Sequence, residues 1–337
     1  MMTKLLVTGG AGFIGSNFIH YVLRNHHDWE VTNLDKLTYA GNLENLQDVE
    51  DDRRYRFVTG DMEERELIDE VISDQFDIIV NFAAESHVDR SIMDPSPFID
   101  TNVKGTQVLL EGAKQYKVAK FIQISTDEVY GSLGAEGKFS EESPPLPNSP
   151  YAASKAAADF LCRAYYHTYG LPVIITRSSN NYGPFQFPEK IVPLVITNAL
   201  EGKPIPVYGD GLNVRDWIHV NDHCCALDVI MQKGRIGEVY NIGGSNERTN
   251  IELVRMILDI MGKPDSLIAF VADRPGHDRR YALDITKITR ELGWRPNNTF
   301  EEALKDTVNW YTEHESWWRS IKSGEYAEYY RKMYSFR

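Results

Sequence analysis

Residues 121–131 read Phe-Ile-Gln-Ile-Ser-Thr-Asp-Glu-Val-Tyr-Gly, and they decide how the rest of the chain is interpreted. The apolar start of this stretch predicts a buried strand. A hydroxyl and two adjacent carboxylates, those of Thr126, Asp127 and Glu128, follow where the strand should end. Ligands of open α/β sheets bind at the carboxyl ends of the strands. We therefore expect an active site at this edge, with the preceding chain binding a cofactor and the following chain holding a substrate.

A phenol and an ammonium follow on the next predicted helix. Ser149 is a favourable N-cap and Pro150 a favourable first helical residue, so Tyr151 should project from the first turn. Lys155 lies four residues further on and therefore on the same helical face. A neighbouring ammonium is expected to lower the pKa of a tyrosine from its usual value of about 10. Such a tyrosine can take the proton of a substrate hydroxyl while a hydride leaves the same carbon.

A glycine-rich turn follows the first expected strand, at residues 4–8. Its glycines, at positions 9, 10, 12 and 15, fit both the G-x-x-G-x-x-G and the G-x-G-x-x-G patterns. They allow a tight turn and a close approach of a pyrophosphate to the start of a helix. Asp35 lies at the end of the second expected strand, twenty residues after Gly15. An acid there accepts hydrogen bonds from a ribose diol and repels a 2′-phosphate, which favours NAD over NADP.

Strands and helices alternate regularly through the first half of the chain. Strands are expected at residues 4–8, 30–34, 55–59, 77–82, 121–124 and 171–176, and helices at 16–24, 64–73, 101–116 and 151–169. This is the spacing of successive βαβ units in a parallel sheet. The sequence therefore predicts an α/β protein with a Rossmann-type, doubly wound parallel sheet.

The alternation breaks after about residue 178. Short strands are expected at 205–208 and 214–218 and helices at 189–201, 251–261, 285–292 and 299–316, whereas 238–244 resembles a strand that returns to the main sheet. We expect a dinucleotide-binding domain of residues 1–178 with a returning segment at about 219–245. Residues 179–218 and 246–337 should form a smaller, interleaved α/β lobe that binds the substrate. The aromatic residues near the C-terminal end are expected to serve packing or a subunit contact (Trp317, Trp318, Tyr326, Tyr329 and Tyr330).

Composition narrows the class of protein. The 337 residues are 42% hydrophobic, which is enough for a substantial core, and they carry a net charge of -13. This charge argues against a nucleic-acid or membrane-surface binder. The three cysteines, two of them adjacent, indicate reduced thiols. No signal sequence or membrane-spanning run is apparent, so a cytoplasmic protein is expected.

Six motifs together resemble one known family. They are TGGAGFIG at 8–15, AESHVDRS at 84–91, STDEVYG at 125–131, YAASK at 151–155, RSSNNYGP at 177–184 and DRPGHD at 273–278. The sequence resembles the extended short-chain dehydrogenase/reductase family and, within it, the dTDP-glucose 4,6-dehydratases, over nearly the whole chain. The Thr126-Asp127-Glu128 motif separates these enzymes from the related sugar-nucleotide epimerases, which share the glycine-rich turn and the Tyr/Lys pair. The loop at 132–149 is shorter than in many members, which puts loop contacts near the site in doubt.

The resemblance implies NAD as cofactor and dTDP-glucose as the nucleotide-sugar substrate, in deoxysugar biosynthesis of the rhamnose type. Tyr151, helped by Lys155 and Thr126, would deprotonate the C4 hydroxyl as a hydride passes from C4 to NAD. The 4-ketone acidifies the C5 proton, which Glu128 would remove, while Asp127 would protonate the departing C6 hydroxyl. The hydride then returns to C6, so water is lost without net redox change. Two adjacent acids with opposite tasks need different pKa values.

The candidate site residues fall into two further groups, and no metal is expected. The cofactor-binding candidates are Gly9, Gly12, Phe13, Ile14, Gly15, Asp35, Asp61, Met62, Ala83, Ala84, Thr101, Tyr151, Lys155 and Asn181. The substrate-binding candidates are Ser86, His87, Thr126, Asn180, Lys190, Tyr208, Arg215, Asn250, Arg274 and His277. Arg215 and Arg274 suit a diphosphate because guanidinium groups match phosphate oxygens, and Tyr208 is a candidate platform for the base. His87 lies in a charged loop that is either substrate-facing or simply solvated.

Three alternatives remain at this point. A C4 epimerase needs no acid/base pair for C5 and C6, and a non-catalytic NAD-binding regulator needs none of the four proton-handling residues. A 4,6-dehydratase specific for UDP-glucose differs only in the base that it recognises, which the sequence does not reveal. The family also implies a homodimer, with the helices at 101–116 and 151–169 pairing between subunits as a four-helix seam.

Overall fold

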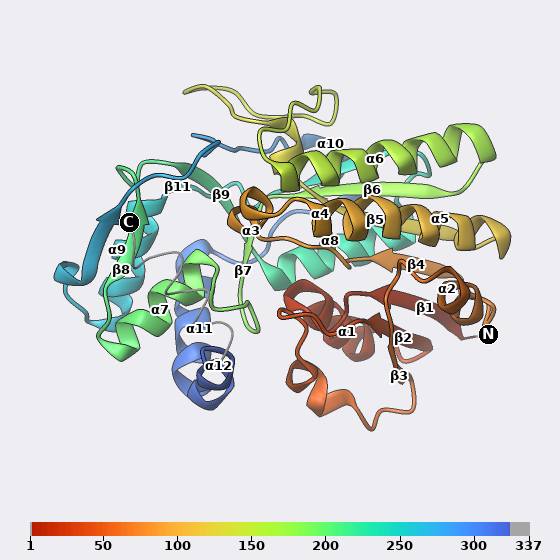
Figure 1. Cartoon of the computed structure of the whole chain (residues 1–337), viewed down its shortest axis with the longest axis horizontal. Coiled ribbons are helices and arrows are strands. Elements are labelled where there is room, and N and C mark those ends of the chain that lie inside the picture. Colours follow the sequence, from red (N-terminus) through yellow and green to blue (C-terminus); the bar gives the residue numbers. More distant parts are fainter. Residues whose placement is uncertain (1, 324–337) are drawn as a thin grey trace.

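The computed structural model describes residues 2–323 and contains a parallel sheet of seven strands (Figure 1). The strand order is β10-β6-β5-β4-β1-β2-β3, and every neighbouring pair is parallel. The strands are β1 (Thr3–Thr8), β2 (Trp29–Asp35), β3 (Tyr55–Thr59), β4 (Ile78–Asn81), β5 (Lys120–Thr126), β6 (Val173–Ser178) and β10 (Val239–Ile242). The order reverses direction between β1 and β4, which is the switch point where doubly wound sheets bind ligands. The predicted Rossmann-type fold is confirmed.

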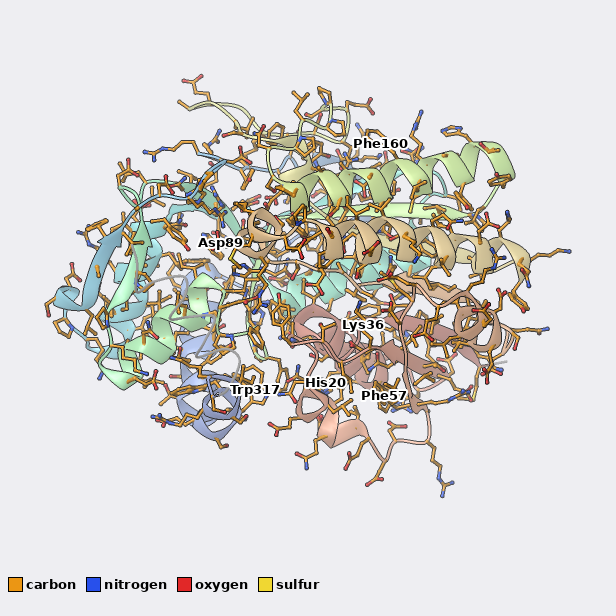
Figure 2. The ribbon with its side chains drawn as sticks, viewed as in Figure 1. His20, Lys36, Phe57, Asp89, Phe160 and Trp317 are labelled. Carbon is orange, nitrogen blue, oxygen red and sulfur yellow. The ribbon has the colours of Figure 1, made fainter. Side chains whose placement is uncertain are left out.

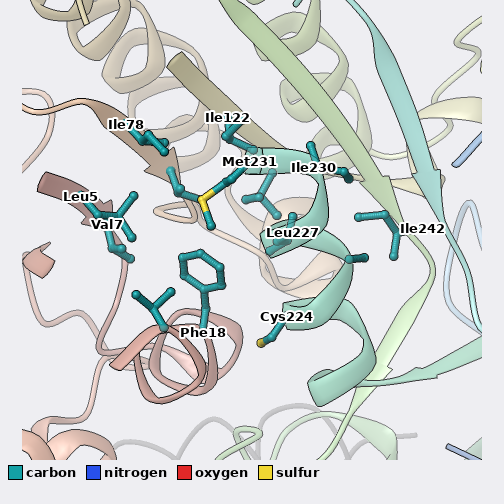
Figure 3. Close-up of a cluster of buried hydrophobic side chains, with 14 of the residues drawn as sticks. Leu5, Val7, Phe18, Ile78, Ile122, Cys224, Leu227, Ile230, Met231 and Ile242 are labelled. Atoms are coloured by element: carbon teal, nitrogen blue, oxygen red, sulfur yellow. The ribbon is translucent and has the colours of Figure 1, made fainter. Parts of the chain in front are cut away.

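Helices cover both faces of this sheet. The helices α1 (Phe13–Asn25) and α8 (Val220–Lys233) lie on one face, and α2 (Arg65–Ile72), α5 (Thr106–Gln115) and α6 (Pro150–Tyr169) lie on the other. Side chains of a strand alternate between faces, so Leu5 and Val7 pack with Phe18 and Leu227 in one core (Figure 3). Leu6 lies between them in sequence and joins the core on the opposite face.

A third core is built from elements of the later part of the chain, which lie beside the seven-stranded sheet (Figure 1). Its strands form a three-stranded sheet of β7 (Asn180–Tyr182), β9 (Val214–His219) and β11 (Glu247–Thr249), and a parallel pair of β8 (Ile205–Tyr208) and β12 (Ile268–Val271). Its helices are α7 (Ile191–Glu201), α9 (Asn250–Met261), α11 (Phe300–Glu313) and α12 (Glu315–Ile321). Trp317 and Trp318 are buried in this core, as packing requires, whereas Tyr326, Tyr329 and Tyr330 lie outside the described residues.

Short elements complete the described chain. They are α3 (Val88–Met93), α4 (Ser96–Phe98), α10 (Thr286–Leu292), three 3-10 turns at η1 (Leu43–Val49), η3 (Asp127–Tyr130) and η4 (Asp265–Leu267), and a π-helical turn at η2 (Ile99–Gly105). The helix expected at 101–116 is therefore regular only from Thr106, because η2 widens its first turns. The helix expected at 299–316 is interrupted at His314, where α11 ends and α12 begins.

Helix α8 was not predicted from the sequence. Its first turn contains polar residues that obscure the apolar period, yet two of them are buried with partners. The carboxylate of Asp222 accepts hydrogen bonds from the backbone N–H groups of Asn297 and Asn298, and the His223 ring bonds the Asn181 side chain at 2.8 Å. Within residues 2–323, no helix is both long enough and apolar enough to cross a membrane.

Candidate active site

A cavity opens at the carboxyl ends of β1, β2, β4, β5 and β6. Its wall contains all five predicted catalytic residues, Thr126, Asp127, Glu128, Tyr151 and Lys155. It also contains every predicted cofactor-binding residue, namely Gly9, Gly12, Phe13, Ile14, Gly15, Asp35, Asp61, Met62, Ala83, Ala84, Thr101 and Asn181, together with Tyr151 and Lys155. The structure therefore brings residues from positions 9 to 181 together at one edge of the sheet.

The glycine-rich turn between β1 and α1 has no room for side chains. Gly9 has a φ of 71°, and a Cβ placed on it would lie 2.6 Å from the backbone nitrogen of Ala83. A Cβ on Gly15 would lie 2.4 Å from the carbonyl oxygen of Gly9. The N-cap of α1 is Gly12, so no side chain occupies the first amide groups of the helix. The turn thus offers N–H donors and the positive end of a helix dipole to an anion.

The second part of the dinucleotide site is formed by Asp35 at the end of β2. Its carboxylate accepts hydrogen bonds from the backbone N–H groups of Ala11 (2.9 Å) and Leu37 (2.8 Å). Burial raises the pKa of this carboxyl, and the two backbone donors oppose that effect. The acid is thereby fixed beside the glycine-rich turn, where a ribose of a dinucleotide would lie. The turn, the open helix end and the oriented acid all fit NAD.

Asp127 and Glu128 follow β5 in a 3-10 turn and do not continue the strand. Thr126 is the N-cap of this turn, and its Oγ1 accepts a hydrogen bond from the backbone N–H of Glu128 at 3.2 Å. The Thr126 hydroxyl also donates to Oδ1 of Asp127 at 3.2 Å. A continued strand would have sent the side chains of Asp127 and Glu128 to opposite faces. The turn removes that alternation, so both carboxyl groups line the same cavity.

Different charges surround the two acids. Burial raises the pKa of Asp127 well above its ordinary value, and the carboxylates of Glu128 and Asp216 raise it further, whereas Arg215 opposes the rise. Burial also raises the pKa of Glu128, and the cations Arg274, Arg215 and Lys190 oppose part of that rise. Oδ2 of Asp127 is buried and has no hydrogen-bond partner among the described residues. The site therefore favours the acid form more strongly at Asp127 than at Glu128.

Tyr151 and Lys155 share a buried face of α6. The expectation that the Lys155 ammonium lowers the pKa of Tyr151 is wrong for this structure. Burial and the charge of Glu128 raise the pKa of the Tyr151 phenol instead of lowering it, although a hydrogen bond with Thr126 opposes the rise. The ammonium of Lys155 donates to the backbone carbonyl of Ile124 at 2.6 Å. Its own pKa is lowered to about 8 by burial. Desolvation of the phenol thus outweighs the distant positive charge.

The predicted substrate-binding residues divide into two sets. Ser86, Asn180 and Lys190 line the cavity with Thr126, and Lys190 donates to the backbone carbonyl of Ser86 at 2.9 Å. The remaining six, His87, Tyr208, Arg215, Asn250, Arg274 and His277, are not part of the cavity wall. Their role in substrate binding, which the resemblance implies, stays a prediction.

Asp89 joins several residues of this second set, and Figure 2 shows it between the two parts of the molecule. The Tyr208 hydroxyl donates to Oδ2 of Asp89 at 3.0 Å, and Arg274 lies 3.6 Å from Oδ1. The His277 ring contacts the edge of Tyr208 at 6.0 Å between centres. Arg215 is buried, and it donates to the carbonyl of Asp278 at 3.0 Å.

The last two members of the set are placed differently. His87 is buried, and its Nε2 lies 3.9 Å from a carboxylate oxygen of Glu189. Burial lowers the pKa of His87 well below its ordinary value, so this ring is neutral. Asn250 is the first residue of α9, and its backbone N–H donates to the carbonyl of Asn213.

Some residues of the cavity wall were missed by sequence reasoning. They are chiefly Lys36, Glu85, Ser178, Ser179, Gln186, Phe187 and Glu189. Lys36 donates to the side chains of Asp61 (3.1 Å) and Thr101 (3.2 Å), both predicted cofactor residues. The adjacency of Lys36 to Asp35 was an available signal, whereas Glu189 had none. Among residues 2–323, no group of three His, Cys, Asp or Glu side chains is arranged to hold a metal ion.

Comparisons with known proteins agree with this geometry. The family model described as GDP-mannose 4,6 dehydratase matches residues 6–307. A dTDP-glucose 4,6-dehydratase of Xanthomonas campestris pv. campestris (strain B100) is 52% identical, over 96% of this chain and 97% of its own length. The dTDP-glucose 4,6-dehydratase of Bacillus anthracis, solved with NAD, is 55% identical with a TM-score of 0.90, over 95% of this chain and all of that one. The Streptomyces venezuelae enzyme of the same name, solved with NAD and a dTDP ligand, is 52% identical with a TM-score of 0.93, again over 95% and 100%.

Proposed function

The chain belongs to the GDP-mannose 4,6 dehydratase family, and we propose that within it the protein is an NAD-dependent dTDP-glucose 4,6-dehydratase. It converts dTDP-glucose to dTDP-4-keto-6-deoxy-glucose with loss of water. The observation that carries this assignment is the Asp127–Glu128 pair, which lines one cavity with Tyr151 while different sets of charges act on the two acids. Elimination across C5 and C6 needs one acid and one base at adjacent carbons, and the pair supplies both.

NAD would be held by the glycine-rich turn, by Asp35 and by the other predicted cofactor residues of the cavity wall. Bound there, it would supply a reversible hydride acceptor for the sugar. Neighbours solved with NAD support this cofactor. The close contacts at Gly9 and Gly15 support the same conclusion from this chain alone, because they bring the backbone within reach of a pyrophosphate.

The proton of the C4 hydroxyl passes to Tyr151. The hydrogen bond with Thr126 lowers the pKa of the Tyr151 phenol against the effect of burial. Lys155 lies one helical turn away, and its positive charge acts in the same direction as this hydrogen bond, against the larger effect of burial. These three groups therefore serve the oxidation of C4, the step that makes the C5 proton acidic.

Glu128 removes the C5 proton, because its neighbouring cations favour the carboxylate. Asp127 gives a proton to the departing C6 hydroxyl, because burial and the adjacent carboxylates favour its acid form. Glu128 then returns a proton to C5. The two residues thus serve as general base and general acid at adjacent carbons.

The nucleotide part of the substrate is proposed to lie along the second set of residues. Arg215 and Arg274 are buried or nearly so, and both exert their charge on Glu128. Their guanidinium groups suit the diphosphate. We assign NAD binding to residues 1–178 with 219–245, and sugar-nucleotide binding to 179–218 and 246–337.

Three finer assignments complete the proposal. A homodimer is expected to form through α5 and α6, because Phe160 and Tyr169 of α6 are each 55% exposed and Phe160 points outward (Figure 2).

The three cysteines are free, which supports a reducing, cytoplasmic compartment. The product suits deoxysugar biosynthesis of the rhamnose type.

The competing functions are disfavoured by the same acids. A C4 epimerase or an NAD-binding regulator has no use for a protonated Asp127 beside an ionised Glu128. A UDP-glucose enzyme would use identical chemistry, so substrate comparison distinguishes it.

The decisive experiment is turnover by the purified protein without added NAD. Incubation with dTDP-glucose should yield a 4-keto-6-deoxy product lighter by one water, measured by mass spectrometry and NMR. UDP-glucose, tested in parallel, should react more slowly. Formation of dTDP-galactose in place of the dehydrated product would instead identify an epimerase.

A further inference from the structure

Helix α6 carries a third buried polar residue on the face that bears Tyr151 and Lys155. Asp159 follows Lys155 by four residues, as Lys155 follows Tyr151, so the three side chains share one stripe. Lys155 is 4% exposed and Asp159 is 2% exposed. The proposed reaction gives Asp159 no task, and a carboxylate is seldom buried without a purpose or a partner.

The partner of Asp159 is Arg177 on β6. Nε of Arg177 donates to Oδ2 of Asp159 at 2.9 Å, and the guanidinium lies 4.8 Å from the centre of the Tyr130 ring. Ser125 on β5 pairs with Arg177 on β6 in the sheet. The Ser125 hydroxyl also lowers the pKa of the Asp159 carboxyl. Burial raises the pKa of Asp159, and Arg177 is the largest influence against it. The guanidinium, which always remains charged, therefore favours an ionised Asp159.

Lys155 needs such a neighbour because it is buried and the group that its ammonium bonds carries no charge. Its ammonium donates to the neutral carbonyl of Ile124 at 2.6 Å. Burial lowers the pKa of Lys155 to about 8, and the negative charge of Asp159 is the main influence in the opposite direction, followed by Cys162 of the same helix. Arg177 bonds Asp159, and the Tyr130 ring packs on the same guanidinium, so the carboxylate lies between the Arg177 cation and Lys155 on its helix.

We infer that Asp159, held by Arg177, is a positioning residue that keeps the Lys155 ammonium charged inside the protein. This inference rests on the proposed function, because the charge matters through the phenolate of Tyr151. Asp159 lies beyond Lys155 from Tyr151 along the helix stripe. Its charge also raises the pKa of Tyr151 directly, so the titration of Lys155, and not activity alone, isolates its action on Lys155.

The test measures the charge of Lys155 directly in wild type and in Asp159→Asn. Competitive labelling with trace acetic anhydride over a range of pH, followed by peptide mass spectrometry at Lys155, gives its titration without substrate. In the wild type, the Lys155 amine should titrate with a pKa of about 8. In Asp159→Asn it should titrate about one to two pH units lower, because the counter-charge is gone. The alkaline limb of kcat should move in the same direction, with near-wild-type activity restored at low pH.

Matched variants separate this effect from a loss of packing. Asp159→Glu keeps the charge and should leave the Lys155 titration within a few tenths of a unit. Asp228→Asn removes another buried carboxylate, which bonds His26 on the far side of the sheet. This variant should leave the Lys155 titration unchanged. If Asp159→Asn does not fold, Arg177→Gln serves instead, because it leaves Asp159 without the cation that keeps it ionised.

An unchanged Lys155 titration in Asp159→Asn would overturn the inference, whatever happens to activity. A lowered titration together with a displaced alkaline limb supports it. If wild type makes no dehydrated product while the Lys155 titration still shifts, the proposed function fails and the electrostatic link between Asp159 and Lys155 stands.

Discussion

Thr126 donates a hydrogen bond from its Oγ1 to Oδ1 of Asp127 at 3.2 Å, where β5 passes into a 3-10 turn. This contact fixes one carboxyl oxygen and leaves Oδ2 buried without a partner among residues 2–323. Burial and the charge of Glu128 favour the protonated form of Asp127, and the Thr126 hydrogen bond and Arg215 offset only part of their effect. The turn positions this acid, and burial gives it the proton that water elimination requires.

Asp127→Asn should retain C4 oxidation but lose dehydration. The amide has no acidic proton for the C6 hydroxyl, so the rate of water loss should fall by about 10²–10⁴-fold. The measurement is formation of the 4-keto-6-deoxy product, followed beside the loss of hydrogen from C4 in a single turnover. Dehydration at the wild-type rate would show that another group protonates the leaving hydroxyl.

Glu128→Gln should bind the nucleotide sugar with little change but stop the exchange of hydrogen at C5. The glutamine has nearly the same size and lacks a basic carboxylate, so the proton on C5 stays in place. Turnover in D₂O, read by NMR of the recovered sugar, reports this exchange. Deuterium at C5 at the wild-type rate would remove Glu128 from the role of base.

Arg274→Gln should displace the acid limb of the pH profile to higher pH. Glu128 works as a carboxylate, so activity is lost as pH falls through its pKa. Burial already raises this pKa, and Arg274 is the largest influence that lowers it. Removal of the guanidinium should therefore raise it further, by about one unit, and the dependence of kcat on pH measures the change. Arg279→Gln is the control, because Arg279 is exposed and bonds Asp210.

Gly15→Ala should destabilise the protein more than Gly12→Ala does. The added methyl on Gly15 meets the Gly9 carbonyl oxygen at 2.4 Å, whereas that on Gly12 meets the same oxygen at 3.3 Å. Overpacking against backbone should lower the free energy of unfolding by about 1–3 kcal/mol for Gly15→Ala. For Gly12→Ala the change should be a few tenths of a kcal/mol. Denaturant unfolding without added NAD measures both, and equal effects would contradict the steric explanation.

Much of the dinucleotide half could be predicted because its signals are local. The strand before Gly9, the glycines at fixed spacing and the acid at the end of the next strand follow one another within 35 residues. Each element packs on its sequence neighbour, so periodicity and turn residues were sufficient. Helix α8 escaped this reasoning because its buried Asp222 and His223 find partners far along the chain.

Local patterns in the sequence were enough to identify the chemical groups that line the cavity: two acids after β5, and a phenol and an ammonium on one face of α6. The electrostatic surroundings of these groups come from the folded chain. The cations Arg274, Arg215 and Lys190 all oppose the rise that burial causes in the pKa of Glu128, whereas at Asp127 Arg215 acts against the carboxylates of Glu128 and Asp216. The same structure turns Lys155 toward the Ile124 carbonyl and raises the pKa of Tyr151. Desolvation and Coulomb interactions depend on distance through space, which a local pattern of residues does not contain.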